Sequence, residues 1–331
     1  MAATRLRRIG RAALAGMALA VGSTVCNTAW AAWPHDKTIR LVVPFAAGGS
    51  TDLIARKVAE GLSKDLDANV IVENRPGAGG TIGSDFVARQ PADGYTILMG
   101  SVSTHGSAEC IYAKLPYDPI KDFTPLGVVA SIPNLMVIGQ SVPANTLQEF
   151  IALLKKDPEH YSYASNGLGT SNHLAAELFK ATAGVSMTHV PYRGSGPALI
   201  DVLGGQVNMM MDVVMTSYPY VKDGKLKALA VTSSQRHPML PDVPTVAEQG
   251  FPGFEAIVWF GLLAPAKLPE AVSKPFIASF ERVMHSPDMK TYLEGQGAEI
   301  PDITGPAFAT MIHDEVDKWC KVAKQANIHL D

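Results

Sequence analysis

The sequence is poor in cysteine, in clustered histidine and in charge, and each scarcity excludes a class of site. Its 331 residues include three cysteines and nine histidines, and the histidines are scattered without the spacing of metal ligands. We therefore expect no metal site. Charged residues make up only 18% of the chain and the formal net charge is −3. A slightly acidic chain of this kind is not expected to bind nucleic acid.

Motifs of catalysis and of nucleotide binding are also missing. The chain has no Gly-x-Ser-x-Gly nucleophile elbow and no Walker A lysine. The glycine run that begins at Gly77 lacks the third glycine of a dinucleotide-binding turn and the acidic residue that should follow about twenty positions on. We therefore expect no cofactor and no enzyme activity. The alternative is a secreted hydrolase with Ser165 as nucleophile and His173 as base, although no acid stands at a recognisable spacing to orient the histidine.

No apolar run is long enough to cross a bilayer comfortably. Residues 12–25 are apolar, they follow four arginines, and Ala29-Trp30-Ala31 is a small-x-small cleavage site. This pattern predicts a secretory signal peptide over residues 1–31 and export to the periplasm. A lipoprotein signal ending at Cys26 is the alternative, and Ser23-Thr24-Val25 matches the small residues of a lipobox poorly.

Cleavage near Ala31 changes both the charge and the cysteine count. It removes four arginines and no acidic residue, which leaves 24 basic against 31 acidic residues and a net charge of −7. It also removes Cys26, so Cys110 and Cys320 remain. An oxidising compartment permits a disulfide between them, and two buried free thiols are the other possibility. The sequence leaves both open because it does not give the distance between the two residues.

The segment 38–52 is the most informative part of the chain. Ile39 to Val43 is a short apolar run rich in β-branched residues, which predicts a strand buried on both faces. Gly48-Gly49 allows a tight turn, and Ser50, Thr51 or Asp52 can cap a helix through Leu62. A strand, a glycine turn and a helix N-terminus present free N–H groups to an anion.

Four turns share this chemistry, and we number them in chain order. Turn 1 is Phe45–Asp52, turn 2 is Asn74–Thr81, turn 3 is Ser165–Ser171, and turn 4 is Tyr192–Gly196. Each follows a predicted strand and opens a predicted helix, so the chain reads as α/β with parallel strands and right-handed crossovers. Ligands of parallel α/β sheets bind beyond the carboxyl ends of the strands. If two such domains face each other, all four turns line one cleft, and a small carboxylate is the natural ligand.

Few side chains in these turns are strong ligand candidates. Arg193 could fork onto a carboxylate or could pair with a neighbouring acid. Asp52 is expected to cap a helix rather than to contact ligand. Phe45 and Tyr192 would give the site apolar walls.

Three further residues stand near the predicted strand ends or helix starts. His105 follows a strand, so it could contact ligand or hold a loop. His173 is expected to pack with its ring nitrogens satisfied. Asp212 could bind an ammonium group or a bridging water, or could cap the following helix.

Two predicted strands are candidates for a hinge. Apolar residues 126–131 and 135–138 are separated by Pro133, and a strand interrupted in this way can begin in one domain and finish in another. Residues 256–263 form the second candidate. These strands predict one domain from residues 32–131 and 262–331, and a second from residues 132–261.

At these residues the sequence resembles the Bug family, the extracytoplasmic receptors of tripartite tricarboxylate transporters. The resemblance covers essentially the whole chain after the predicted signal peptide. The matching motifs are Pro44–Asp52, Asn74–Thr81, Asp93–Thr96, Leu115–Asp118 with Lys121–Phe123, His173-Leu174, Val190–Gly194 and Leu240–Thr245.

The resemblance implies a periplasmic binding protein-like fold, with two α/β domains joined by two crossing strands around a ligand cleft. It implies a monomeric receptor that closes on a small carboxylate and delivers it to the membrane subunits of such a transporter. A sensory role, in which the loaded receptor docks on a membrane sensor, is an alternative. Candidate ligands are dicarboxylates, tricarboxylates, acidic amino acids and aromatic acids. The ligand-binding residues that it implies, together with those argued above, are Phe45, Ala47, Gly48, Gly49, Asp52, Gly79, Gly80, Thr81, Ser101, His105, Ser165, Gly169, Thr170, Ser171, Tyr192, Arg193, Gly194 and Asp212.

Overall fold

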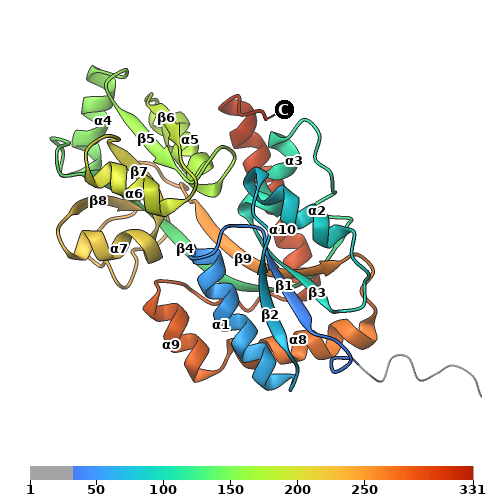
Figure 1. The fold of residues 1–331 in the computed structure, drawn as a ribbon. Coiled ribbons are helices and arrows are strands. Elements are labelled where there is room, and N and C mark those ends of the chain that lie inside the picture. Colours follow the sequence, from blue (N-terminus) through green and yellow to red (C-terminus); the bar gives the residue numbers. More distant parts are fainter. Residues whose placement is uncertain (1–32, 331) are drawn as a thin grey trace, which may run out of the picture.

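The computed structural model describes residues 33–330 and shows two lobes joined by a pair of strands (Figure 1). The predicted signal peptide lies outside the described residues. Across residues 33–330, no helix is both long enough and apolar enough to span a membrane.

The first lobe is built on the strands that precede turns 1 and 2. β1 pairs in parallel with β2 and with β3. Leu41 and Val43 belong to one apolar core and Val42 to another, so β1 is buried on both faces as its composition predicts. The elements of this lobe are β1 (Ile39–Val43), α1 (Ser50–Asp65), β2 (Val70–Asn74), α2 (Thr81–Ala88), β3 (Thr96–Ser101), α3 (Ala108–Ile111), α8 (Glu270–Met284), α9 (Pro287–Gly295) and α10 (Gly305–Gln325), with a 3₁₀ turn over Ala78–Gly80 and a π-helical turn over Val102–Gly106.

The second lobe repeats the same construction. β5 pairs in parallel with β6 and with β7, so turns 3 and 4 leave the same edge of the sheet. Thr146 caps the first helix of this lobe, because its side chain accepts the Glu149 N–H. The elements are α4 (Leu147–Lys156), β5 (Ser162–Ser165), α5 (Ser171–Ala183), β6 (Thr188–Pro191), α6 (Ser195–Leu203), β7 (Met209–Val213), α7 (Val214–Lys222) and β8 (Leu226–Val231).

Two strands run through the middle of the molecule, β4 (Phe123–Gly139) and β9 (Ile257–Pro265). β9 is antiparallel to both β3 and β4, and β4 is antiparallel to β7 and β8. The prediction of a parallel sheet is therefore right within each lobe and wrong for the strands that join the lobes. The reason is topological, since a strand that returns from the other lobe arrives in the opposite direction.

The predicted interruption at Pro133 is also wrong, because β4 is one strand of 17 residues. Pro133 lies opposite Ile257 at the end of the pairing with β9, and from Asn134 onward β4 pairs with β7 and β8 instead. Proline lacks an N–H, so it is tolerated where the strand changes partners. The proline marks the crossing point without breaking the strand.

Asn134 links β4, at the point where it crosses between the lobes, to the second lobe through hydrogen bonds. Its side chain donates to the Ala256 carbonyl at 3.0 Å, and its backbone N–H donates to Thr232 Oγ1 at 2.8 Å. These bonds hold β4 against the chain that leads into β9. The predicted domain boundaries fall inside β4 and β9 and stay a prediction.

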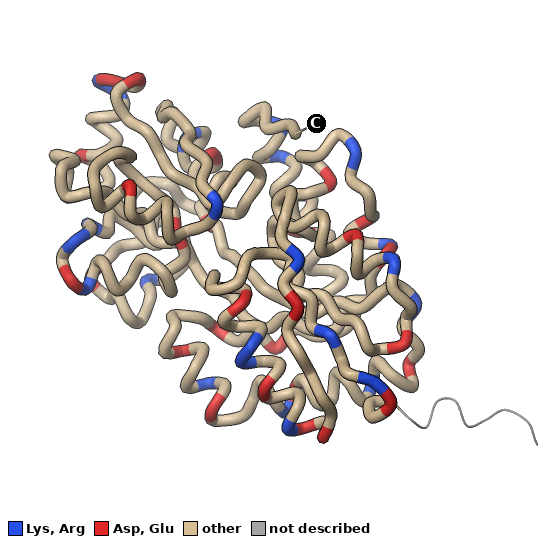
Figure 2. Tube along the Cα trace, viewed as in Figure 1, with Lys and Arg blue, Asp and Glu red and all other residues tan. Residues whose placement is uncertain are grey.

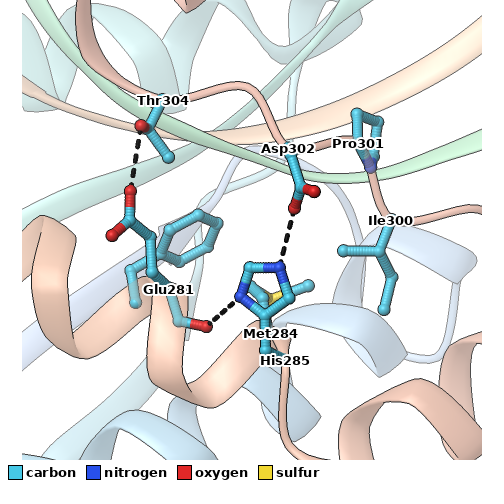
Figure 3. Close-up of a pocket in the computed structure, with 8 residues that line it drawn as sticks. Glu281, Met284, His285, Ile300, Pro301, Asp302 and Thr304 are labelled. Atoms are coloured by element: carbon cyan, nitrogen blue, oxygen red, sulfur yellow. Dashed lines mark hydrogen bonds and ion pairs between the residues drawn. The ribbon is translucent and has the colours of Figure 1, made fainter.

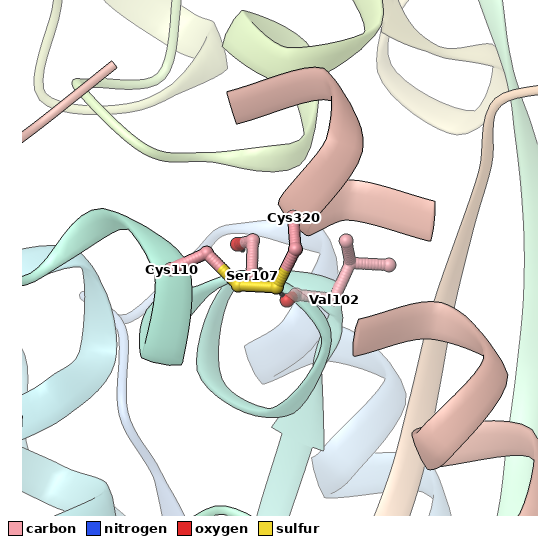
Figure 4. Close-up of a disulfide and its surroundings, with 4 residues drawn as sticks. All are labelled: Val102, Ser107, Cys110 and Cys320. Carbon is pink, nitrogen blue, oxygen red and sulfur yellow. Dashed lines mark hydrogen bonds between the residues drawn. A yellow bond between two sulfur atoms is a disulfide. The ribbon is translucent and has the colours of Figure 1, made fainter. Parts of the chain in front are cut away.

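A disulfide joins Cys110 of α3 to Cys320 of α10, with the two Cα atoms 5.2 Å apart (Figure 4). The bond lies beside Val102 of the π-helical turn and Ser107, the residue that follows the turn. Neither this turn nor α3 is predicted from the sequence, in which the residues after β3 read as a loop. α7 is likewise unpredicted.

Candidate functional site

Turns 1 and 2 lie next to each other because β1 and β2 are parallel neighbours. Asn74 connects them, since its side-chain amide donates to the Phe45 carbonyl at 3.1 Å and to Asp52 Oδ1 at 2.9 Å. The first residue of turn 2 therefore fixes the position of turn 1.

Asp52 does not cap α1 in the predicted way. The N-cap residue is Gly49, and the carboxylate of Asp52 reaches back to accept the Gly48 N–H at 2.9 Å. Burial alone would raise the pKa of Asp52, but hydrogen bonds from Arg56, Gly48 and Asn74 outweigh burial and hold its pKa below the usual value. Asp52 is thus a buried acceptor that shapes turn 1, in keeping with a structural rather than a ligand-contact role.

The backbone of turn 1 is exposed to solvent. Ala47, Gly48 and Gly49 are exposed, while the Phe45 ring is only half-buried beside them. The Gly48 N–H is used by Asp52, and among the described residues the Gly49 N–H has no hydrogen-bond acceptor. An exposed amide at the start of a 16-residue helix is a favourable position for an anion.

Turn 2 needs its glycines for space and for backbone angle. Gly79 and Gly80 have φ of 62° and 101°, and an added Cβ would lie 2.6 Å from the Tyr112 hydroxyl or 2.7 Å from Thr104 Cγ2, respectively. Thr81 opens α2, and its hydroxyl donates to the Ala78 carbonyl at 3.0 Å. Of the residues predicted to bind ligand here, Gly79 and Gly80 have no side chain, and the Thr81 hydroxyl is already hydrogen-bonded within the turn.

Turn 3 of the second lobe touches the first lobe. A Cβ built on Gly79 would lie 3.9 Å from the Leu168 carbonyl oxygen. Ser107 donates its hydroxyl to the Gly169 carbonyl at 3.4 Å, and a Cβ on Gly169 would meet Ile111 at 3.4 Å. Turns 2 and 3 are thus neighbours across the two lobes, and a ligand site shared by the four turns stays a prediction.

Turns 3 and 4 are joined through Ser195 and Asp212. The Ser195 hydroxyl lies 2.7 Å from Asp212 Oδ1 and 3.1 Å from Asn166 Oδ1. Asp212 also accepts from Thr216, and burial raises its pKa to about 6 despite these hydrogen bonds. Because Asp212 is fully buried, it organises the second-lobe turns and does not face an exposed ligand in this conformation.

Ser165 contacts a histidine that the sequence argument missed. Its hydroxyl lies 2.6 Å from His189 Nε2, and it also bonds to both the N–H and the carbonyl of Gly167. His173, the predicted base, instead accepts the Gly169 N–H through Nδ1 at 3.1 Å. Among the described residues, no carboxylate hydrogen-bonds to His189, so no catalytic triad is assembled here.

The remaining members of turns 3 and 4 have local roles. Thr170 donates its hydroxyl to the Gly167 carbonyl at 2.7 Å, and Ser171 is the first residue of α5. Tyr192 is half-buried, and burial together with its hydrogen bond to Asp201 raises its pKa to about 12. Gly194, with φ of 118°, is the N-cap residue of α6.

The two predicted ligand-binding residues at and after the end of β3, Ser101 and His105, are buried. His105 has no exposed surface, its ring packs edge-on against Phe123 at 4.5 Å, and burial lowers its pKa to about 3. Ser101 is buried as well, and its N–H donates to Thr104 Oγ1 at 2.9 Å. Of the two roles left open for His105, the buried ring agrees with holding the local backbone, because the chain after β3 folds inward as a π-helical turn; ligand contact by His105 stays a prediction.

Arg193 remains the cationic side chain of the turns. It is exposed, and no described residue forms a salt bridge with it. Figure 2 shows acidic and basic residues interspersed over both lobes, without a large region of one sign. An anion must therefore be bound by groups close to it, because the described residues form no large basic surface to supply an attractive electrostatic field.

A cavity lies elsewhere, on the first lobe (Figure 3). It has a volume of about 250 Å³ and lies between α8 and the segment that precedes α10. His285 bonds there to Asp302 at 2.7 Å, and Glu281 bonds to Thr304 at 3.1 Å. None of the four turns contributes to it. Within residues 33–330, no cluster of His, Cys, Asp or Glu is arranged to hold a metal ion.

The comparison with known proteins is consistent with this arrangement. Residues 54–328 match the model of the tripartite tricarboxylate transporter family receptor. The chain belongs to this receptor family. The family consists of substrate-binding receptors, so the receptor is not an enzyme and the Ser165 hydrolase hypothesis is wrong. A curated relative, protein BugT of Bordetella pertussis, is 34% identical and covers 89% of this chain and 90% of its own length.

Three solved structures resemble the receptor closely. Rpa4515 of R. palustris with adipate gives a TM-score of 0.85 at 36% identity, covering 90% of this chain and all of its own. The periplasmic binding protein BugD gives 0.82 at 35% identity, covering 89% and 99%. MatC of Rhodopseudomonas palustris with bound malate gives 0.80 at 35% identity, covering 86% and 98%. The predicted periplasmic binding protein fold is thereby confirmed.

Proposed function

We propose that this receptor captures a small carboxylate between its lobes in the periplasm and delivers it, as a monomer, to the membrane subunits of a tripartite tricarboxylate transporter. Two of its structural neighbours hold adipate and malate, which are both small dicarboxylates. Closure would be a hinge motion at the crossing of β4 and β9, favoured by ligand contacts to both lobes.

One observation carries the proposal, namely the convergence of turn backbones from both lobes. Turn 1 exposes its amides next to turn 2, and turn 2 touches turn 3 across the lobes. Backbone N–H groups at several helix N-termini suit a carboxylate better than a neutral or cationic solute. Calorimetric titration of the mature protein with a panel of acids tests this. Binding of at least one small carboxylate is expected, and failure of every acid in the panel would contradict the proposal.

Replacing Gly49 with proline tests whether a main-chain amide binds the acid. Gly49 has φ of −81°, which proline can adopt, so the change removes the N–H without opposing the turn. Loss of one charge-assisted hydrogen bond is expected to weaken binding about 10- to 100-fold. Titration of the variant with the best acid of the panel measures the effect.

Gly49→Ala is the matched control, because it keeps the N–H and its Cβ would have its nearest neighbour at 3.8 Å. This variant should bind like the parent protein. Equal affinity of the proline and alanine variants would show that the amide does not contact ligand.

Arg193→Gln tests the side-chain contribution. The guanidinium is exposed and free of a described salt bridge, so its loss should leave the unfolding midpoint unchanged. If Arg193 holds one carboxylate of a diacid, affinity for the diacid falls about tenfold, and the dependence of affinity on salt concentration weakens. Affinity for the matching monoacid should change less. An equal loss for both acids would assign Arg193 a role in shaping turn 4.

A further inference from the structure

Beneath turn 3 lie two histidine rings that face each other. His173 of α5 and His189 of β6 have ring centroids 4.0 Å apart and planes only 10° from parallel. The Tyr163 ring of β5 lies 4.8 Å from the His189 ring and 6.3 Å from the His173 ring, with its plane 17° from parallel to each. The parallel pairing of β5 with β6 places Tyr163 opposite His189 and so builds the stack.

Each ring holds a different part of turn 3. His173 Nδ1 accepts the Gly169 N–H at 3.1 Å, near the end of the turn. His189 Nε2 lies 2.6 Å from the hydroxyl of Ser165, the first residue of the turn. That hydroxyl also bonds to both the N–H and the carbonyl of Gly167, whose φ of 131° lies in the region that favours glycine. The rings therefore restrain the turn at both ends.

The chemistry of the His173 contact requires a neutral ring, because a protonated Nδ1 would be a donor facing another donor. Burial lowers the pKa of His173 to about 4, and Lys180 acts in the same direction. Burial also lowers the pKa of His189 to about 3, and His173 and Lys180 act in the same direction while Glu177 opposes them. Glu177 is bound by Lys180 at 2.6 Å and by the Tyr163 hydroxyl, so it does not compete for either imidazole.

We infer that His173 and His189 are positioning residues that set ligand affinity by fixing the backbone of turn 3 without contacting ligand. The inference rests on the proposed function only for its effect on affinity, since the positioning itself exists without ligand. It also changes the predicted use of Gly169, because the N–H of that residue is already engaged and is not free to bind a carboxylate.

Two variants separate positioning from simple packing. His173→Asn places a side-chain oxygen near the position of Nδ1 and can still accept the Gly169 N–H. His173→Phe keeps an aromatic ring for the stack but has no acceptor. In ligand-free protein, hydrogen exchange followed by NMR should show the Gly169 N–H protected in the parent and in His173→Asn, and unprotected in His173→Phe. With adipate as the probe, His173→Phe should bind about tenfold more weakly than His173→Asn, the expected cost of one hydrogen bond.

The outcomes can be told apart. Undiminished Gly169 protection in His173→Phe would overturn the inference. Weak binding without loss of protection would also overturn it, since the affinity would then depend on something other than the turn. If adipate binds none of the proteins but protection follows the predicted pattern, the ligand assignment fails and the positioning role stands.

If His173→Phe does not fold, an NMR measurement on the parent protein still tests the inference. A hydrogen bond from the Gly169 N–H to His173 Nδ1 should transmit a scalar coupling between the two nitrogens. Observation of that coupling supports the contact on which the inference rests, and its absence contradicts it.

Discussion

Replacing both Cys110 and Cys320 with serine is expected to lower the free energy of unfolding by about 3–5 kcal/mol. The disulfide closes a segment of 210 residues, which includes all of the second lobe, and so removes many conformations from the unfolded chain. Urea unfolding of the oxidised parent and of the double variant measures the difference.

The parent protein treated with reductant is the matched control, because its chain is unchanged apart from the bond. It should unfold at the same urea concentration as the double variant. A shift of less than about 1 kcal/mol between oxidised and reduced protein would mean that the bond restrains little beyond what packing already holds. The variant should also disturb turn 3 only modestly, since Ser107 and Ile111 carry the contacts of this region to Gly169.

Asp212→Asn is expected to stabilise the protein at pH 7 by about 1–3 kcal/mol. The side chain is fully buried, and its pKa of about 6 lies above the unfolded value of 3.8. Folding therefore favours the protonated acid. The stability contributed by this group is complete below pH 4 and is lost as pH rises through 6. An asparagine has no charge to lose, and the hydroxyl groups of Ser195 and Thr216 can rotate to suit it.

The decisive quantity is the difference in unfolding free energy between Asp212→Asn and the parent, measured from pH 4 to pH 7. The difference should grow with pH and level off above about 6. Buried histidines such as His105 titrate in both proteins, so their opposite pH dependence cancels in the difference. Asp223→Asn, at an exposed carboxylate beside Lys225, is the control for the loss of one carboxylate from the surface. A pH-independent difference at Asp212 would contradict the raised pKa.

Much of the local structure follows from the sequence because it depends on neighbouring residues. The apolar run of β1 and the glycines of turn 1 appear where predicted, and Thr146 caps α4 through a bond to the N–H three residues on. α9 and α10 each have a proline within their first two residues, where a missing N–H costs no helical hydrogen bond. Such features are fixed by hydrophobic pattern, capping and backbone freedom, which act over a few residues.

The candidate site is less predictable, because its contacts join residues far apart in the chain. His189 carries no local signal, and its contact with Ser165 arises only when β5 and β6 pair in register. The burial of His105 depends on Phe123 of β4, which packs over it. By contrast, the Gly48 and Gly169 N–H groups are engaged locally, each by a side chain four residues further along the chain.

By itself the sequence determined that this chain is an α/β receptor whose glycine turns follow its strands. The conformational freedom of a turn depends on the residue types within it, so the sequence is sufficient to locate such turns. Only the tertiary structure decided that β4 runs unbroken past Pro133, that Cys110 meets Cys320, and that Asp212 is sealed inside the second lobe. Strand register, helix docking and burial are cooperative properties of distant segments, and no short stretch of sequence contains them.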